Sequence, residues 1–273
     1  MDKGPIGVFD SGYGGLTILR EICGLMPQYD YLYLGDNARA PYGTRSFDVV
    51  YEFTSQAVRY LFGQGCHLVI LACNTASAKA LRTIQQKDLP RLDPHRRVLG
   101  VIRPTVEIVQ SISQTRHVGI MATPGTIRSR TYELEIAKLC PDIKVTGEAC
   151  PMWVPLVENE EYDKPGADYF VSQRIESLLR RDPLIDSIIL GCTHYPLLMG
   201  KIRQYMPQGI HIIEQGGYVA QSLKDYLHRH SGMEQSITRG GSVRFLTTEQ
   251  AETFQKKATV FMGGPVEAER VQL

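Results

Sequence analysis

The chain has 273 residues, 43% of them apolar, and its 30 Lys and Arg nearly balance its 29 Asp and Glu. This length suffices for roughly two domains, and the composition excludes a disordered or collagen-like protein. With a net charge of +1 the chain has no excess of basic residues for binding nucleic acid, so we expect no nucleic-acid partner and favour a small molecule as ligand. The longest aliphatic run, residues 68–72, is much shorter than the ~20 residues of a membrane-spanning helix, so we expect no membrane association.

The start of the chain and its cysteines indicate the compartment. The first residues lack the basic and apolar regions of a secretory signal, so we expect a cytoplasmic protein. In a reducing cytosol, cysteines remain thiols rather than forming a disulfide framework. The spacing C-x-x-C, typical of redox motifs and zinc knuckles, does not occur. The six cysteines are Cys23, Cys66, Cys73, Cys140, Cys150 and Cys192.

Short apolar runs alternate along the chain with segments of helical period. One helical segment covers residues 47–62, with Ser46 as its N-cap and Gly63 near its end. Because the strands are continuously apolar, helices should cover both faces of each sheet, which predicts a doubly wound α/β fold with mostly parallel sheets. The expected strands are Ile6–Phe9, Tyr31–Leu34, Leu68–Ala72, Val98–Ile102, Val118–Ala122, Lys144–Thr146, Ser187–Leu190, Ile210–Ile213 and Val243–Leu246.

Two segments occur twice in the chain and predict two pseudo-symmetric lobes. Residues 68–75 and residues 187–194 are both apolar runs that lead into a cysteine. Residues 6–12 resemble residues 118–125, each an apolar run that leads into a turn containing glycine. Prolines and basic residues interrupt the pattern near Arg91–Val98, which indicates a boundary there.

The repeat predicts the lobe boundaries and the place of the site. We expect lobe one to comprise residues 1–96 and 212–273, because the last strands and helices are too few for a domain of their own. Lobe two then comprises residues 97–211. Ligands of α/β sheets bind beyond the carboxyl ends of the strands, so the cleft between the lobes is the expected active site. The motif residues expected there are Asp10 and Cys73 from lobe one, and Cys192 and His194 from lobe two.

Cys73 and Cys192 each stand between a strand and the start of a helix, where the helix dipole and backbone N–H groups lower a thiol pKa. Two equivalent thiols on opposite walls of a cleft suit racemisation, since one base removes a proton from a carbon acid while an acid supplies a proton to the other face. A nucleophilic cysteine would need only one thiol and a His base. The other four cysteines have no such context, and we expect them to pack in the core.

Three other kinds of site compete with this interpretation. A metal bound by Cys73, Cys192 and His194 is disfavoured, because thiols separated by a substrate cannot both reach one ion at ~2.3 Å. A dinucleotide loop after the first strand fails on spacing, because position 17 is Thr rather than Gly. A lysine for pyridoxal phosphate stays open on sequence alone, although nothing marks Lys79, the lysine nearest to a motif.

Four blocks of the sequence resemble the cofactor-independent glutamate racemases of the aspartate/glutamate racemase superfamily. They are residues 7–16, Gly35–Ser46, Ala72–Ser77 and Gly191–Pro196. The resemblance implies glutamate buried between two α/β lobes, no cofactor and no metal. It also implies interconversion of L-glutamate and D-glutamate, with D-glutamate supplied for peptidoglycan precursor synthesis. By analogy with the family we expect a homodimer.

The resemblance also assigns roles to residues. It implies that Cys73 and Cys192 transfer the protons, Cys73 acting on D-glutamate and Cys192 on L-glutamate. Asp10 would meet the substrate ammonium group and assist Cys73, and Ser11 would line the same wall. His194 would assist Cys192.

Glu158 would be the acidic partner of His194, although Glu160 and Glu161 stay open for that role. Tyr42 and Gly43 would close the first lobe over the substrate. The residues expected to contact its carboxylates or line the site are Asn74, Thr75, Thr123 and Thr193.

The sequence departs from the family pattern in two places. Arg103 and Thr105 stand where an acidic or small residue and a glycine are more usual, and residues 214–217 replace an Asp-Ser type of turn. We expect neither departure to touch the chemistry, and both to affect loop geometry and subunit contacts. Two alternatives to glutamate racemisation stay open: racemisation of aspartate or another amino acid, and binding of an amino acid without turnover.

Overall fold

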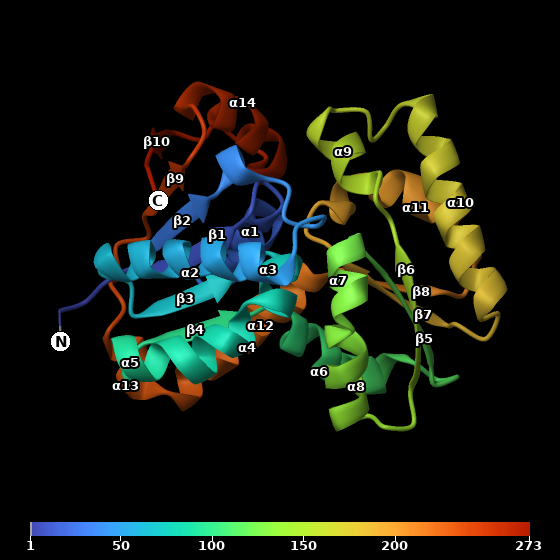
Figure 1. Ribbon diagram of the computed structural model, residues 1–273, viewed down its shortest axis with the longest axis horizontal. Helices are drawn as coiled ribbons and strands as arrows, with labels where there is room; N and C mark the ends of the chain where they lie inside the picture. Colours follow the sequence, from blue (N-terminus) through green and yellow to red (C-terminus); the bar gives the residue numbers. More distant parts are fainter. Residues whose placement is uncertain (1) are drawn as a thin grey trace.

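The computed structural model of the protein describes residues 2–273 and contains two β-sheets flanked by helices (Figure 1). The first sheet has the strand order β10-β9-β2-β1-β3-β4, and the second has the order β6-β5-β7-β8. All neighbouring strands run parallel, so the predicted α/β class is confirmed. The strands are β1 Ile6–Asp10, β2 Tyr31–Gly35, β3 Leu68–Leu71, β4 Arg97–Gly100, β5 His117–Ala122, β6 Lys144–Ala149, β7 Ser187–Gly191, β8 His211–Ile213, β9 Val243–Thr247 and β10 Ala268–Arg270.

Helices connect the strands, as parallel pairing requires. The predicted helix over residues 47–62 is α2, where the Ser46 hydroxyl accepts a hydrogen bond from Val49 N at 3.4 Å. The α-helices are α1 Gly15–Leu25, α2 Phe47–Gly63, α3 Asn74–Lys79, α4 Leu81–Thr83, α5 Leu89–Leu92, α6 Ile102–Ile112, α7 Pro124–Ser129, α8 Thr131–Leu139, α9 Trp153–Glu158, α10 Pro165–Arg181, α11 Met199–Tyr205, α12 Gln215–Arg229, α13 Ser231–Gln235 and α14 Ala251–Met262. Short 3₁₀ or π segments cover Asn37–Arg39, Ile84–Asp88 and Tyr195–Leu198.

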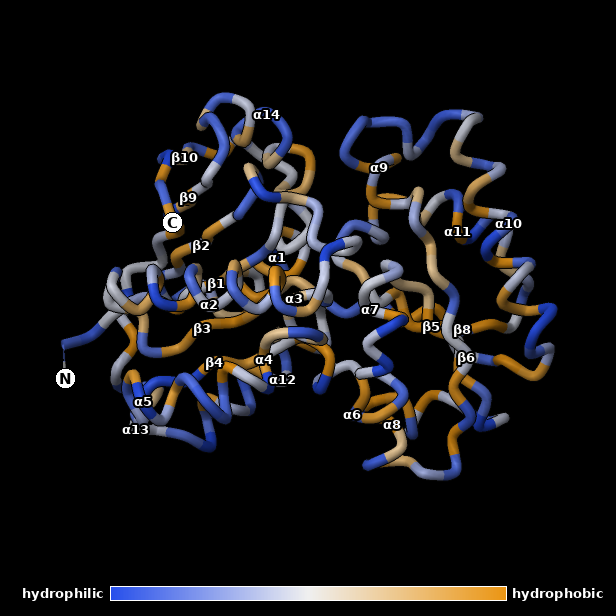
Figure 2. Tube along the Cα trace, viewed as in Figure 1, coloured by the Kyte–Doolittle hydropathy of each residue, from blue (hydrophilic) through white to orange (hydrophobic). Residues whose placement is uncertain are grey.

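Apolar side chains fill both faces of the sheets, which explains the continuously apolar strands. Along β1, Val8 packs into one buried cluster and Phe9 into another on the opposite face. The cluster around Val8 extends to Leu190 of β7 in the other sheet, so apolar packing is continuous between the lobes. Figure 2 shows the hydrophobic residues concentrated along the strands and on the helix faces turned toward them. The covered sheets leave their carboxyl ends as the place for a ligand.

The last two strands of the chain belong to the first sheet. β9 pairs with β2, and β10 extends the sheet beyond β9. The exact lobe limits stay a prediction, and the strand pairs favour limits that differ from the expected ones. β4 pairs with β3, although the expected boundary assigned residues 97–100 to lobe two. β8 pairs with β7 and crosses the expected boundary at 211/212, so the sheets favour limits after β4 and after β8.

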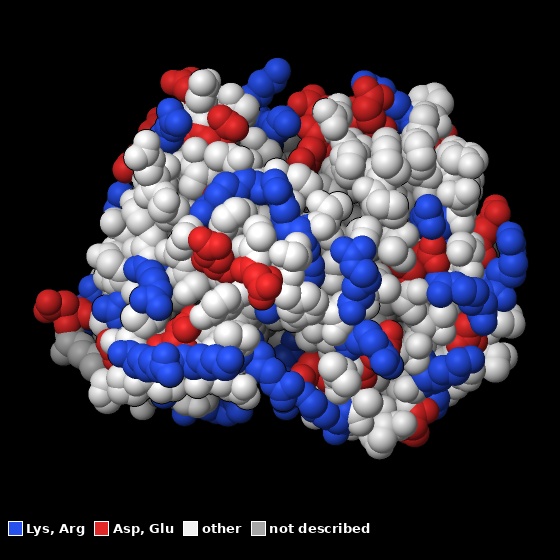
Figure 3. All heavy atoms as spheres, viewed as in Figure 1, with Lys and Arg blue, Asp and Glu red and all other residues white. Residues whose placement is uncertain are grey.

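Charged side chains of both signs share the face of the molecule shown in Figure 3. In the basic stretch near residue 96, Arg96 Nε donates to Asp93 at 3.2 Å and Arg96 Nη1 donates to the carbonyl of Phe62 at 2.6 Å. These bonds tie the stretch to its own lobe. None of the helices within residues 2–273 combines the length and the apolar character needed to cross a membrane.

Candidate active site

A cavity of about 120 Å³ lies where the carboxyl ends of β1, β3, β5 and β7 face each other. It is smaller than the ~300–1,000 Å³ of pockets for drug-sized ligands, so it suits a small substrate. Residues from both lobes line it, and every side chain predicted for the site is among them. They are Asp10, Ser11, Tyr42, Gly43, Cys73, Asn74, Thr75, Thr123, Glu158, Cys192, Thr193 and His194.

Cys73 follows β3 and caps the first turn of α3. Its Sγ accepts a hydrogen bond from Ala76 N at 3.4 Å, and the Ser11 hydroxyl lies 3.3 Å from the same sulfur. Burial raises the pKa of Cys73 to about 12, and the nearby charge of Asp10 acts in the same direction. The expectation that the helix start would lower this pKa is therefore wrong for Cys73, because burial outweighs the N–H groups. At neutral pH Cys73 is a thiol.

Asp10 ends β1 beside Cys73. Its side chain is buried, and Oδ2 accepts a hydrogen bond from Gly12 N at 2.8 Å. Burial raises the pKa of Asp10, while the positive charge of His194 across the cavity lowers it. A carboxylate held in this way has unused acceptor capacity directed at the cavity, which suits a cationic group of a ligand.

Cys192 follows β7 in the second lobe and has a different neighbour. His194 Nδ1 lies 3.9 Å from Cys192 Sγ, and His194 Nε2 lies 3.1 Å from Glu158 Oε1. Burial opposes the charged imidazole, but its contacts with Cys192 and Glu158 prevail and raise the pKa of His194 to about 10. At neutral pH His194 is therefore an imidazolium ion that lies between the Cys192 sulfur and the Glu158 carboxylate.

Of the three acidic residues left open by the sequence, the structure brings only Glu158 to His194. Glu158 is the last residue of α9, and its contact with His194 lowers the pKa of its carboxyl despite burial. Glu161 lies 2.8 Å from Lys164 Nζ. Glu160 is exposed and lies in a turn with φ of 58°.

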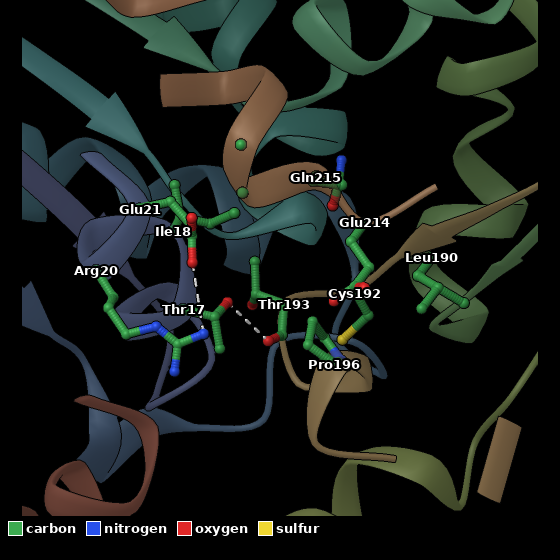
Figure 4. Close-up of a pocket in the computed structure, with 12 residues that line it drawn as sticks. Thr17, Ile18, Arg20, Glu21, Leu190, Cys192, Thr193, Pro196, Glu214 and Gln215 are labelled. Carbon is green, nitrogen blue, oxygen red and sulfur yellow. Dashed lines mark hydrogen bonds and ion pairs between the residues drawn. The ribbon is translucent and has the colours of Figure 1, made fainter. Parts of the chain in front are cut away.

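Gly14 and Thr17 of the first lobe contact Thr193 and His194, the two residues that follow Cys192. A Cβ atom at Gly14 would overlap the ring of His194 and the hydroxyl of Thr193, so only glycine permits this close approach. Thr17 Oγ1 donates to the carbonyl of Thr193 at 3.1 Å (Figure 4). A second cavity of about 250 Å³ lies behind this contact, and Cys192 lines both cavities.

The two lobes also meet on the other side of the cavity. The hydroxyls of Thr75 and Thr123 lie 3.1 Å apart, and Thr123 Oγ1 accepts a hydrogen bond from Thr126 N at 3.2 Å as the cap of α7. Gly125 N donates to the carbonyl of Gly43 at 2.8 Å. Together these bonds hold the loop of Gly43 against the second lobe, over the cavity.

A hydrogen bond to Asp36 fixes the position of Tyr42. The Tyr42 hydroxyl donates a short hydrogen bond to Asp36 Oδ2, and Arg39 Nε lies 2.7 Å from the same carboxylate. Both Tyr42 and Asp36 are buried. Tyr42 therefore reaches the cavity wall as a fixed element rather than a mobile side chain.

Two features of the site escaped the sequence prediction. Cys150, expected to be only a packing residue, lines the cavity. It directly follows β6, so its place at a strand end was the available signal. The second feature is that the two departures from the family pattern bind each other and a residue of the cavity wall; whether they affect the chemistry stays a prediction. Gln215 Nε2 donates to Thr105 Oγ1 at 2.9 Å, and Gln215 Oε1 accepts from Asn74 Nδ2 at 2.6 Å.

The chain is similar to known proteins in both sequence and fold. The family model "Asp/Glu/Hydantoin racemase" matches residues 17–222. A glutamate racemase of Paracoccus denitrificans is 40% identical over 97% of this chain and 98% of the relative. The crystal structure of glutamate racemase RacE1 from Bacillus anthracis has a TM-score of 0.90 and 33% identity, over 100% of this chain and 99% of that one. The glutamate racemase of Francisella tularensis, solved with D-glutamate, has a TM-score of 0.86 and 31% identity, over 100% and 98%.

Proposed function

The chain belongs to the aspartate/glutamate/hydantoin racemase family, and on that premise we propose that it interconverts L-glutamate and D-glutamate without a cofactor. The observation that carries the proposal is one small cavity lined by a thiol from each lobe, Cys73 and Cys192. The relatives that match nearly the whole chain are glutamate racemases, and one of the similar structures holds D-glutamate.

The reaction follows a two-base route. The Cys192 thiolate takes the Cα proton of one enantiomer, and the electron pair left on Cα accepts a proton from the Cys73 thiol on the opposite face. Cys192 is then a thiol and Cys73 a thiolate, which is the state required for the reverse reaction. By analogy with the family, Cys192 acts on L-glutamate and Cys73 on D-glutamate.

Neighbouring groups support each thiol. His194 keeps a positive charge beside Cys192, and Glu158 supports that charge from the other ring nitrogen. On the other wall, Asp10 receives the substrate ammonium group, which offsets the charge that disfavours a Cys73 thiolate. Ser11 contributes a hydroxyl within hydrogen-bond distance of the Cys73 sulfur.

The remaining lining residues bind and enclose the substrate. Hydroxyl and amide donors suit the two carboxylates of glutamate, and these donors come from both lobes. Tyr42 and Gly43 close the cavity on the side of the first lobe. The residues proposed to hold the carboxylates are Asn74, Thr75, Thr123 and Thr193.

We further infer that the product D-glutamate is used in peptidoglycan precursor synthesis, and that the enzyme acts in the cytoplasm as a homodimer. The names of the relatives support the first inference. The proposed first lobe comprises residues 1–96 and 212–273, and the second comprises residues 97–211. Strand pairing favours moving both limits, so that β4 belongs to the first lobe and β8 to the second.

A direct test incubates the purified protein with L-glutamate in heavy water, with no cofactor added. Loss of optical rotation together with deuterium at Cα supports the proposal. Unchanged rotation with measurable binding would instead indicate an amino-acid-binding protein. L-Aspartate in a parallel reaction tests the substrate, because two thiols determine the reaction type and not the side chain that is accepted.

A further inference from the structure

Three buried side chains close a ring of hydrogen bonds behind the cavity. Asn74 Nδ2 donates to Gln215 Oε1 at 2.6 Å, and Gln215 Nε2 donates to the Tyr132 hydroxyl at 2.7 Å. The Tyr132 hydroxyl donates to Asn74 Oδ1 at 2.7 Å, which completes the ring. Each side chain is 3% exposed, so no water competes for these groups. Every bond in such a ring strengthens the next one.

Thr105 determines which way the amide group of Gln215 is oriented in the ring. Its hydroxyl donates to the carbonyl of Val101 at 2.9 Å, so Thr105 Oγ1 has only acceptor capacity left for Gln215. Gln215 must therefore turn its NH₂ group toward Thr105, at 2.9 Å, and its oxygen toward Asn74. With the Gln215 amide reversed, two oxygens would face each other at Thr105.

The ring ends on a residue of the cavity wall. Asn74 is the first residue of α3, directly after Cys73, and it lines the cavity. The ring uses one hydrogen of Asn74 Nδ2 and leaves the second hydrogen unused. The three members come from α3, α8 and α12, so the ring joins the lobe of Cys73 to the lobe of Cys192 at this point.

We propose that Thr105, Tyr132 and Gln215 are positioning residues that hold the Asn74 amide with its free N–H toward a carboxylate of the substrate. The inference rests on the proposed function, since it needs a dicarboxylate in the cavity. It also gives a joint role to the two departures from the family pattern: Thr105 stands in one, Gln215 in the other, and the two bind each other. With the ring broken, Asn74 rotates and the carboxylate loses a donor, while Cys73 and Cys192 keep their own partners.

The sharpest test uses Thr105→Val and its matched control Thr54→Val. Both threonines are fully buried in helices, and each hydroxyl donates to the carbonyl four residues earlier, at 2.9 Å for Thr105 and 2.6 Å for Thr54. Thr105 alone also accepts from Gln215. We expect Thr105→Val to raise KM for both glutamate enantiomers about tenfold with kcat changed less than threefold, and Thr54→Val to leave KM unchanged. Thr105→Ser, which keeps the hydroxyl, should restore the KM.

A second pair covers the case in which Thr105→Val fails to fold. Tyr132→Phe removes the ring hydroxyl, and Tyr31→Phe removes a buried hydroxyl that donates to the carbonyl of Met26 at 2.7 Å, away from the cavity. Only Tyr132→Phe should raise KM. Equal KM values within both pairs, in a wild-type enzyme that racemises glutamate, would overturn the positioning role and leave the proposed function standing. A wild-type protein that does not racemise glutamate would overturn the proposed function, and the positioning role with it.

Discussion

The two halves of the site are built on the same scaffold but give their thiols neighbours of opposite charge. Cys73 and Cys192 both follow a central parallel strand and line one cavity. Cys73 has the acidic neighbour Asp10, and burial raises its pKa to about 12. Cys192 has the neighbour His194, whose pKa is raised to about 10 and which stays cationic. The repeat thus supplies matched positions, and the neighbours distinguish them, with a carboxyl group beside Cys73 and an imidazolium ion beside Cys192.

The largest effect is expected from removing either thiol. Cys73→Ala and Cys192→Ala should each lower racemisation by about 10³-fold or more, since general acid and base groups contribute about 10²–10⁴-fold and the proposed route needs both thiols in every turnover. Cys66→Ala and Cys140→Ala serve as controls, because both remove a buried thiol outside the cavity. Racemisation rates in both directions, with circular dichroism for folding, give the comparison. Near-normal activity of either active-site variant would rule out the paired role.

Gly14→Ala should displace His194 beside Cys192 and leave the surroundings of Cys73 unchanged. The new methyl group would overlap the His194 ring, and displacement of that ring by ~1 Å is enough to cost about 10²-fold in kcat. Gly24→Ala is the control, because a Cβ atom at Gly24 meets nothing within 4 Å. Steady-state kinetics and thermal melting separate loss of activity from loss of fold. Equal activity of the two variants would show that His194 is not needed in its present position.

The raised pKa of His194 predicts the pH dependence of the reaction. The imidazolium charge of His194 beside Cys192 persists up to about pH 10, so the part of the rate that depends on this charge should fall as the pH rises through about 10, roughly tenfold for each further unit. The contribution of His194 to the free energy of unfolding has the same sign, since it is complete below pH 6.5 and lost as the pH rises toward 10. Rate profiles of kcat/KM between pH 6 and 11 test this, and a flat profile across pH 10 would contradict it.

Glu158→Gln should give the smallest of these effects, a loss of roughly fivefold at neutral pH. Without the carboxylate, the pKa of His194 falls, and the alkaline limb of the rate profile should move to lower pH. Glu161→Gln is the control, because its partner is Lys164 rather than His194. If the alkaline limb of the Glu158→Gln rate profile does not move, the Glu158 carboxylate does not support the charge of His194 beside Cys192.

The sequence predicted the parts of this structure that depend on local pattern. Apolar runs revealed every strand except β10, which has the sequence Ala-Glu-Arg and depends on pairing with β9. The cysteines at the ends of β3 and β7 were marked by their repeated context. Cys150 stands at the end of β6 without such a repeat, and it lines the cavity although the sequence predicts only a packing role.

Contacts between distant segments were beyond the sequence. The bond between Asn74 and Gln215 joins residues 141 positions apart, and no periodicity or motif indicates it. The sequence likewise does not show which acidic residue contacts His194, because this depends on where the end of α9 places Glu158 relative to the His194 ring. The pKa of Cys73 is raised by burial although the thiol stands at the start of α3, and local pattern does not reveal how deeply a side chain is buried.

The most direct test of paired, opposite thiols is the order in which deuterium enters the two enantiomers. L-Glutamate is incubated with the enzyme in heavy water, and both enantiomers are separated at early times and analysed for deuterium at Cα. If one thiol removes the proton and the other supplies a deuteron, D-glutamate carries deuterium from the start while the remaining L-glutamate is unlabelled. Deuterium appearing equally early in the recovered L-glutamate would mean that a single group both removes and returns the proton, and would contradict the account.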